Sequence, residues 1–208
     1  MSSVAHKFGW NRFPTRTLGV ACVVIVVYCG QLLAAGSLDP TAAYRWVTEF
    51  QMSIGAGTVV FSWLFHSSLE HILGNLVVFF LAGWWVESRI DNDRYLLGVA
   101  IGLGIGANVA ALIVVGEGGL GISGVTSGLV AMVALGAVQW LYEHSRVDWL
   151  VMLQAIGAVL WLLVSVGAVG TLPPGTAVSV HRFGIVFGVV WYVVEQGRYE
   201  FQKGVNGR

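Results

Sequence analysis

Six apolar segments alternate with short polar stretches along the chain. Each segment is close to the roughly 20 residues that an α-helix needs to cross the hydrocarbon core of a bilayer. Their length and continuous apolar character predict an all-α, polytopic membrane protein with a bundle of six transmembrane helices. The predicted spans cover residues 17–36, 67–87, 94–115, 123–142, 147–169 and 180–197.

The stretch between the first two spans, residues 37–60, is too polar to cross a membrane. It carries Tyr44, Trp46 and Phe50, and aromatic residues are enriched where a membrane meets water. We therefore predict an interfacial loop that contains a short amphipathic helix.

The distribution of basic residues orients the predicted helices. By alternation of the spans, nine of the 11 Lys and Arg residues fall on one side of the membrane, while Arg45 and Arg182 fall on the other. Because cytoplasmic loops are enriched in basic residues, both termini are predicted to be cytoplasmic, in a multi-pass protein of the plasma membrane. The predicted organisation is a cytoplasmic segment at 1–16, a six-helix membrane domain at 17–197 and a cytoplasmic tail at 198–208.

The composition supports a membrane location and excludes one class of partner. Only 11% of the residues are charged and 56% are hydrophobic, whereas a soluble domain has about 25% charged residues. The formal net charge is zero and there is no basic block, so nucleic acid is not an expected partner. The lipid bilayer is an expected partner.

Polar residues at membrane depth are costly and are therefore candidates for function. In the stretch HSSLEHILGN, Ser67 and Glu70 form a capping-box pattern, which predicts that the second span starts just after His66. His71 and Asn75 then lie four residues apart on one helix face. Taken alone, this pair is explained as well by a hydrogen bond between helices, worth about 0.6 kcal/mol in a membrane.

Glycines predict a close contact between the fourth and sixth spans. The start of each span contains two glycines four residues apart, and small residues at this spacing let helix backbones approach closely. Both spans start from the outer side of the membrane, so the contact would bring His181 close to Ser123. The glycine pairs are Gly124 with Gly128, and Gly184 with Gly188.

Ser123 and His181 have the chemistry of a minimal activated nucleophile, because an imidazole can take the hydroxyl proton and later return it to the leaving amine. Ser123 follows the loop GEGGLGIS, which is too rich in glycine for a stable helix and predicts irregular backbone beside a water-filled cavity. A helix start also favours developing negative charge. His71, Asn75 and the Ser123 amide are therefore candidates for an oxyanion hole. Ser127, one turn deeper, is the rival nucleophile.

The segments HSSLEHILGN, GISG and HRFGIVFG resemble, in this order and on these spans, the three signature segments of rhomboid intramembrane serine proteases. The resemblance covers about residues 60–195 and implies a serine–histidine dyad without an aspartate. Ser123 matches the nucleophile and His181 the general base. His71 and Asn75 match the oxyanion-stabilising pair. The supporting matches are His66 near the start of the second span, Gly121 and Gly124 flanking the serine, and Gly184 and Gly188 on the last span.

Two features depart from the family pattern. Ser127 stands where many rhomboids have an aromatic residue that packs against the catalytic histidine, and Gly57 and Thr58 stand where bacterial members often carry a Trp-Arg pair. Neither departure removes a catalytic atom. Glu87 follows the pattern and resembles a glutamate with a structural role at the cytoplasmic end of the second span.

The resemblance implies a serine endopeptidase that hydrolyses peptide bonds in or near the transmembrane segments of single-span membrane proteins. The alternative is a catalytically inactive rhomboid-like protein that binds transmembrane clients, although such relatives have typically lost the serine or the histidine. A transporter or channel is disfavoured because the second, fourth and sixth spans turn apolar below the polar cluster. No His-Glu-x-x-His pattern suggests a metal, and neither a cofactor nor a nucleotide is expected.

Overall fold

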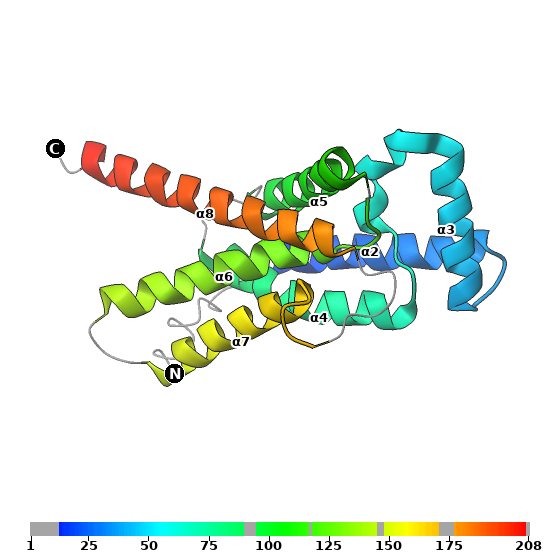
Figure 1. Ribbon diagram of the computed structural model, residues 1–208. Helices are drawn as coiled ribbons and strands as arrows, with labels where there is room; N and C mark the ends of the chain where they lie inside the picture. Colours follow the sequence, from blue (N-terminus) through cyan, green and yellow to red (C-terminus); the bar gives the residue numbers. More distant parts are fainter. Residues whose placement is uncertain (1–12, 90–94, 117, 145–147, 171–176, 207–208) are drawn as a thin grey trace.

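The computed structural model describes residues 13–89, 95–116, 118–144, 148–170 and 177–206. They form seven α-helices and two short 3-10 helices (Figure 1). The α-helices are α2 (Thr15–Ala34), α3 (Pro40–Ile54), α4 (Leu69–Arg89), α5 (Tyr95–Val115), α6 (Ser123–Glu143), α7 (Trp149–Ser165) and α8 (Val178–Asn206), and the 3-10 helices are η1 (Gly55–Val60) and η2 (Ser62–Leu64).

Six of the α-helices correspond to the six predicted spans. Helices α2, α4, α5, α6 and α8 are long and apolar enough to cross a membrane. Helix α7 is apolar but has 17 residues, which is about the lower limit for a span. The prediction of an all-α polytopic bundle is confirmed. Helix α8 continues to Asn206, past the predicted end of its span.

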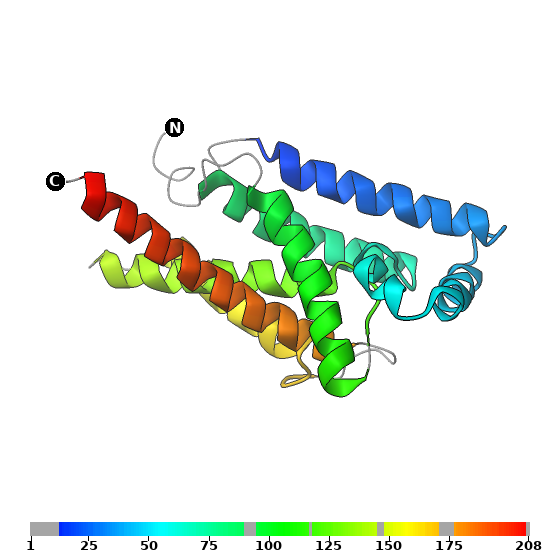
Figure 2. The ribbon, with the colours of Figure 1, turned by 90° about the horizontal axis from the view of Figure 1, so that it is seen from above.

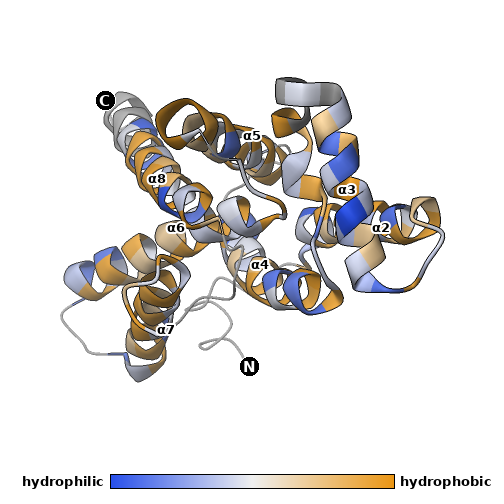
Figure 3. Ribbon diagram, turned by 45° about the vertical axis from the view of Figure 1, so that its right-hand side comes forward, coloured by the Kyte–Doolittle hydropathy of each residue, from blue (hydrophilic) through white to orange (hydrophobic). Residues whose placement is uncertain are grey.

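Large apolar side chains cover the outside of the bundle. Leu33, Val77, Ile113 and Leu153 are each at least 60% exposed, and an apolar surface of this extent does not suit a monomeric soluble protein. Figure 3 shows the hydrophobic colour along α2, α5 and α7. Such a surface suits lipid, and the chain is a multi-pass integral membrane protein.

Helix α3 lies at one end of the bundle, at an angle to α2 (Figures 1 and 2). The Asp39 carboxylate accepts a hydrogen bond from the Thr41 amide at 2.9 Å, and Pro40 is the first helical residue. Both choices are favoured at a helix start. Ala43 and Val47 are fully buried on one face, while polar residues lie on the other. This helix falls in the stretch expected at the membrane interface.

Helix α6 is the central helix of the bundle. Of its most apolar stretch 72% is buried, compared with 22–39% for the other four long helices. It contacts α4, α5, α7 and α8. Its first residue, Ser123, therefore lies inside the protein and not against lipid.

Helices α6 and α8 pack through facing glycines, as predicted. A Cβ atom on Gly184 would collide with the carbonyl oxygen of Gly124, and a Cβ atom on Gly188 would collide with that of Gly128. Backbones can approach this closely only where side chains are absent. The contact brings the first turn of α8 beside the start of α6.

At the end of the bundle away from α3, helix α4 is tied to the start of α2. The Glu87 carboxylate accepts hydrogen bonds from the amides of Arg16 and Thr17 at 2.9 and 2.8 Å, and from the Thr17 hydroxyl at 2.7 Å. A negative charge here satisfies free N–H groups and suits the helix dipole. This contact agrees with the structural role implied for Glu87.

Candidate active site

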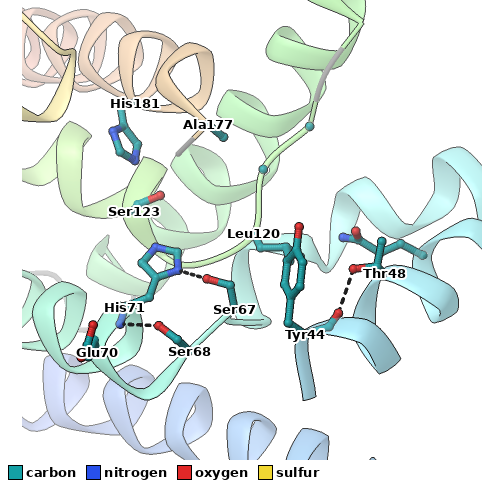
Figure 4. Close-up of a pocket in the computed structure, with 13 residues that line it drawn as sticks. Tyr44, Thr48, Ser67, Ser68, Glu70, His71, Leu120, Ser123, Ala177 and His181 are labelled. Atoms are coloured by element: carbon teal, nitrogen blue, oxygen red, sulfur yellow. Dashed lines mark hydrogen bonds between the residues drawn. The ribbon is translucent and has the colours of Figure 1, made fainter. Parts of the chain in front are cut away.

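The starts of α4, α6 and α8 meet around one cavity of about 440 Å³ (Figure 4). Helix α3 and the loop ahead of α6 complete its walls. Three of the predicted site residues, His71, Ser123 and His181, line this cavity. The full lining consists of Tyr44, Thr48, Gln51, Ser67, Ser68, Glu70, His71, Gly118, Gly119, Leu120, Ser123, Ala177 and His181.

Ser123 begins α6 and is 4% exposed. Side-chain and backbone acceptors hold the loop before it. The Gly119 amide donates to Oδ1 of Asn108 at 2.9 Å, and the Gly121 amide donates to the Ser62 carbonyl at 3.1 Å. Irregular backbone at membrane depth needs such partners in the protein. The Ser123 amide is among the first N–H groups of α6, which have no partner within the helix.

Gly121 passes directly against two histidine rings. Its φ of +99° lies in the left-handed region, which favours glycine. A Cβ atom here would lie 3.0 Å from Cε1 of His71 and 3.2 Å from Cδ2 of His66. The backbone conformation therefore favours glycine two residues before the serine, and a side chain there would also crowd the two rings.

His181 lies in the first turn of α8, with Nδ1 2.6 Å from the carbonyl oxygen of Ser165, the last residue of α7. Because a carbonyl only accepts, the ring proton is on Nδ1 and Nε2 carries the free lone pair. In Figure 4 the ring lies beside Ser123. No hydrogen bond joins these two described side chains, and such bonds are often long before substrate binds.

His71 faces the cavity near Ser123 (Figure 4), and its Nδ1 lies 2.9 Å from the Ser67 hydroxyl. Ser68 caps the helix, since its hydroxyl accepts a hydrogen bond from the His71 amide at 3.1 Å. The predicted capping box of Ser67 and Glu70 is therefore wrong by one residue. As a result, Ser67 is free to orient the His71 ring, and Glu70 lines the cavity.

Asn75 lies one turn further along α4. Its side chain is 8% exposed and does not line the cavity. Its Nδ2 is buried and has no hydrogen-bond partner in the described part of the chain. A buried donor left without a partner costs roughly 1–3 kcal/mol. Of the two residues predicted for the oxyanion hole, the cavity wall includes His71 but not Asn75.

His66 is fully buried and connects three parts of the fold. Its Nε2 accepts a hydrogen bond from the Ile122 amide at 3.3 Å, and its Nδ1 lies 3.2 Å from the Leu64 carbonyl. Gln31 holds its backbone: the His66 amide donates to Oε1 at 2.9 Å, and Nε2 of Gln31 donates to the His66 carbonyl at 2.8 Å. Burial, with His71 nearby, lowers the pKa of His66 to about 3, so the neutral ring remains an acceptor.

Ser127, the rival nucleophile, is fully buried inside α6. Its hydroxyl donates to the Ser123 carbonyl at 2.8 Å, a back-bond that helical serines often make. It does not line the cavity. Of the two serines, only Ser123 lines the cavity.

Three residues that shape the site were not predicted from the sequence: Gln31, Asn108 and Ser165. Gln31 and Asn108 are single polar residues within apolar segments, and Ser165 acts through its backbone carbonyl. None of them belongs to a spacing pattern that sequence analysis can detect. Among the described residues, no three His, Cys, Asp or Glu side chains come together as a metal site.

The fold and the cavity together define a polytopic helical membrane protein with a serine and histidines gathered at one end of its bundle. The family model named Rhomboid domain matches residues 55–196, which is more than half of the chain. The chain belongs to the rhomboid family, and the predicted family is confirmed. No curated protein and no solved structure matches the chain.

The contact between Gln31 and His66 generates a prediction about stability. Gln31→Leu removes the partners of a buried N–H and a buried carbonyl, each worth about 1–3 kcal/mol when left unpaired. We expect a lower midpoint of denaturation in detergent micelles. Gln154→Leu is the matched control, because this half-buried glutamine has no hydrogen bond within the described residues. Equal midpoints for the two variants would contradict the structural role of Gln31.

Proposed function

We propose that the chain is an intramembrane serine protease of the rhomboid type, with Ser123 as nucleophile and His181 as general base. The observation that carries the proposal is that the two residues line one cavity, with Nε2 of His181 left free by the Ser165 carbonyl. Membership of the rhomboid family supports the same activity, because the family consists generally of intramembrane serine proteases.

In the proposed reaction, Nε2 of His181 takes the hydroxyl proton of Ser123 while Oγ attacks the carbonyl carbon of the substrate. The tetrahedral intermediate collapses, the C–N bond breaks, and the same proton passes to the leaving amine. Water then attacks the acyl-enzyme, with His181 again as the base. This step releases the second product and restores the serine hydroxyl.

The Ser165 carbonyl orients the histidine ring, which is one of the roles of the aspartate in a catalytic triad. By accepting the Nδ1 proton at 2.6 Å, it favours the tautomer and ring orientation that leave Nε2 toward the serine. It belongs to the last turn of α7, where carbonyl groups lack helical partners and the helix dipole is negative. The positive ring formed during attack is therefore stabilised.

We assign the oxyanion hole to His71, Asn75 and the Ser123 amide. When the Ser67 hydroxyl donates to Nδ1 of His71, the ring proton is on Nε2, which is a free donor. The unpartnered Nδ2 of Asn75 is a second donor on the same helix. Donors held in place before charge develops are the main source of oxyanion stabilisation. Asn75 does not line the cavity, so its side chain must turn toward the cavity to contribute.

The proposed substrates are single-span membrane proteins, cut in or near the transmembrane segment. Family membership implies substrates within the bilayer. A peptide bond inside a helix is shielded, so a substrate must unwind before its carbonyl reaches Ser123. Hydrolysis requires water, and the cavity provides space for it beside polar side chains.

A rhomboid-like protein that binds clients without cutting them is the alternative function. The retained serine and histidine disfavour it, because each is open to the cavity. A transport pathway is disfavoured by the apolar, fully packed interior of α6 below its first turns.

We further propose that both termini are cytoplasmic and that the cavity opens to the outer side of the plasma membrane, because nine basic residues fall on the side of the termini. In a background without Cys22 and Cys29, Leu38→Cys should react with an impermeant thiol reagent added to intact cells. Glu143→Cys should react only after permeabilisation. The reverse pattern would overturn the orientation.

Ser123→Ala is expected to reduce cleavage of a single-span substrate in liposomes by about 10⁶-fold, the scale seen when a catalytic serine is removed. Labelling by a fluorophosphonate should disappear with it, since that reaction needs an activated serine. His181→Ala should lose both activities, and Ser127→Ala should retain both. Full activity in Ser123→Ala, together with its loss in Ser127→Ala, would refute the assignment.

His71→Ala and Asn75→Ala are each expected to lower kcat by roughly 100- to 1,000-fold, the effect of removing one oxyanion donor. The loss should fall on kcat and not on KM, because the oxyanion exists only in the transition state. The control is His144→Ala, an exposed histidine at the other end of α6. An unchanged kcat in both site variants would return the pair to a role in helix packing.

A further inference from the structure

The cavity extends well beyond the dyad, and its walls differ in chemistry. Tyr44, Thr48 and Gln51 of α3 line one side with uncharged polar groups. Glu70 lies beside His71, on the opposite side from Tyr44 and Thr48 in Figure 4. Among the described residues that line the cavity, Glu70 is the only one with a charged side chain.

None of the described residues pairs with the Glu70 carboxylate. Ser68 provides the cap that the sequence had assigned to the pair of Ser67 and Glu70. Within the described part of the chain, Glu70 makes no hydrogen bond and no ion pair, and its side chain is exposed. Its position in the first turn of α4 suits the helix dipole, but that interaction leaves both oxygens open to a ligand.

No Lys or Arg is among the described residues that line the cavity. Arg45 and Arg182 are the two basic residues predicted on the side of the membrane that carries the cavity. Both are exposed, and neither lines the cavity. A substrate strand bound at Ser123 would therefore meet one negatively charged side chain on one flank and no basic side chain among the described lining residues.

We infer that Glu70 is a specificity-determining residue, which favours substrates with Lys or Arg close to the cleaved bond and disfavours Asp or Glu there. The inference rests on the proposed protease function and names a chemical class of substrate for it. An extended strand advances about 3.3 Å per residue, and a Lys or Arg stem is long and flexible. The proposal places the basic residue within about three positions of the bond, on the flank of the cavity that Glu70 lines.

The strength of the preference for a basic residue depends on how much water surrounds the ion pair between Glu70 and the substrate. An exposed ion pair in water is worth little, but a bound substrate displaces water from the cavity and strengthens the attraction. An acidic substrate residue in the same place is repelled by Glu70. The discrimination between basic and acidic substrates therefore combines attraction of one with repulsion of the other. We expect the basic substrate to exceed the acidic one by about tenfold in kcat/KM, which equals about 1.4 kcal/mol.

The test uses the full-length protein in liposomes and a single-span substrate with one variable residue. That residue is set to Lys, Gln or Glu at each of three positions on either side of the cleaved bond. We expect kcat/KM to fall in the order Lys, Gln, Glu for positions on one side of the cleaved bond only. Glu70→Gln should remove this order, Glu70→Lys should reverse it, and high salt should weaken it. Glu49→Lys is the matched control, since Glu49 is exposed on α3 and does not line the cavity.

A measurement of substrate binding without cleavage distinguishes a failure of the Glu70 inference from a failure of the proposed protease function. The same labelled substrates are titrated into Ser123→Ala, with and without Glu70→Gln, and followed by fluorescence anisotropy. Absence of cleavage by the unmodified protein, with tighter binding of the Lys substrate, would overturn the protease and support the charge preference. Equal binding of the Lys and Glu substrates, or an order that Glu70→Gln leaves unchanged, would overturn the role of Glu70. Glu70→Gln keeps the test valid if Glu70→Lys does not fold.

Discussion

Helices α6 and α8 approach until backbone meets backbone, and the arrangement of the site depends on this contact. Gly124 faces Gly184 and Gly128 faces Gly188, with no room for a Cβ atom on α8. Within a bilayer, helices associate through close packing, because lipid tails are as apolar as the side chains. A bulkier residue at these positions would move the first turn of α8 away from the start of α6, and the histidine away from the serine.

A second constraint follows from the low polarity of the surroundings: irregular backbone inside the bundle must find its partners in the protein. Single polar side chains from neighbouring helices supply them. Gln31 pairs with the backbone of His66, and Asn108 accepts the hydrogen bond of the Gly119 amide. His66 then accepts from the Ile122 amide, so the residue before Ser123 is held by a ring whose own backbone is held by α2. The start of α6 is fixed by hydrogen bonds as well as by packing.

Ser127 stands where many rhomboids have an aromatic residue, and in this chain another group restricts the ring of His181. An aromatic ring at that position would restrict His181 by stacking. In this chain the Ser165 carbonyl restricts it by a hydrogen bond, while the Ser127 hydroxyl bonds to its own helix. A backbone carbonyl is present whatever the side chain, so the orientation of the His181 ring depends on where α7 ends and not on the identity of one residue.

The sequence by itself determined the all-helical membrane fold and the family, and it supplied the candidate residues for the proposed chemistry. A bilayer sets the length of a spanning helix, and the ordered motifs stand at the starts of the spans. Local patterns were less decisive: Ser67 and Ser68 both fit a helix cap, and only the hydrogen bonds separate their roles, since the His71 amide donates to Ser68 and the His71 ring contacts Ser67. Tertiary structure alone decided that Gln31 supports the backbone of His66, that a carbonyl orients His181, and that Asn75 does not line the cavity. These contacts join residues far apart in the chain, and several use backbone groups, which every residue has and which no sequence pattern marks.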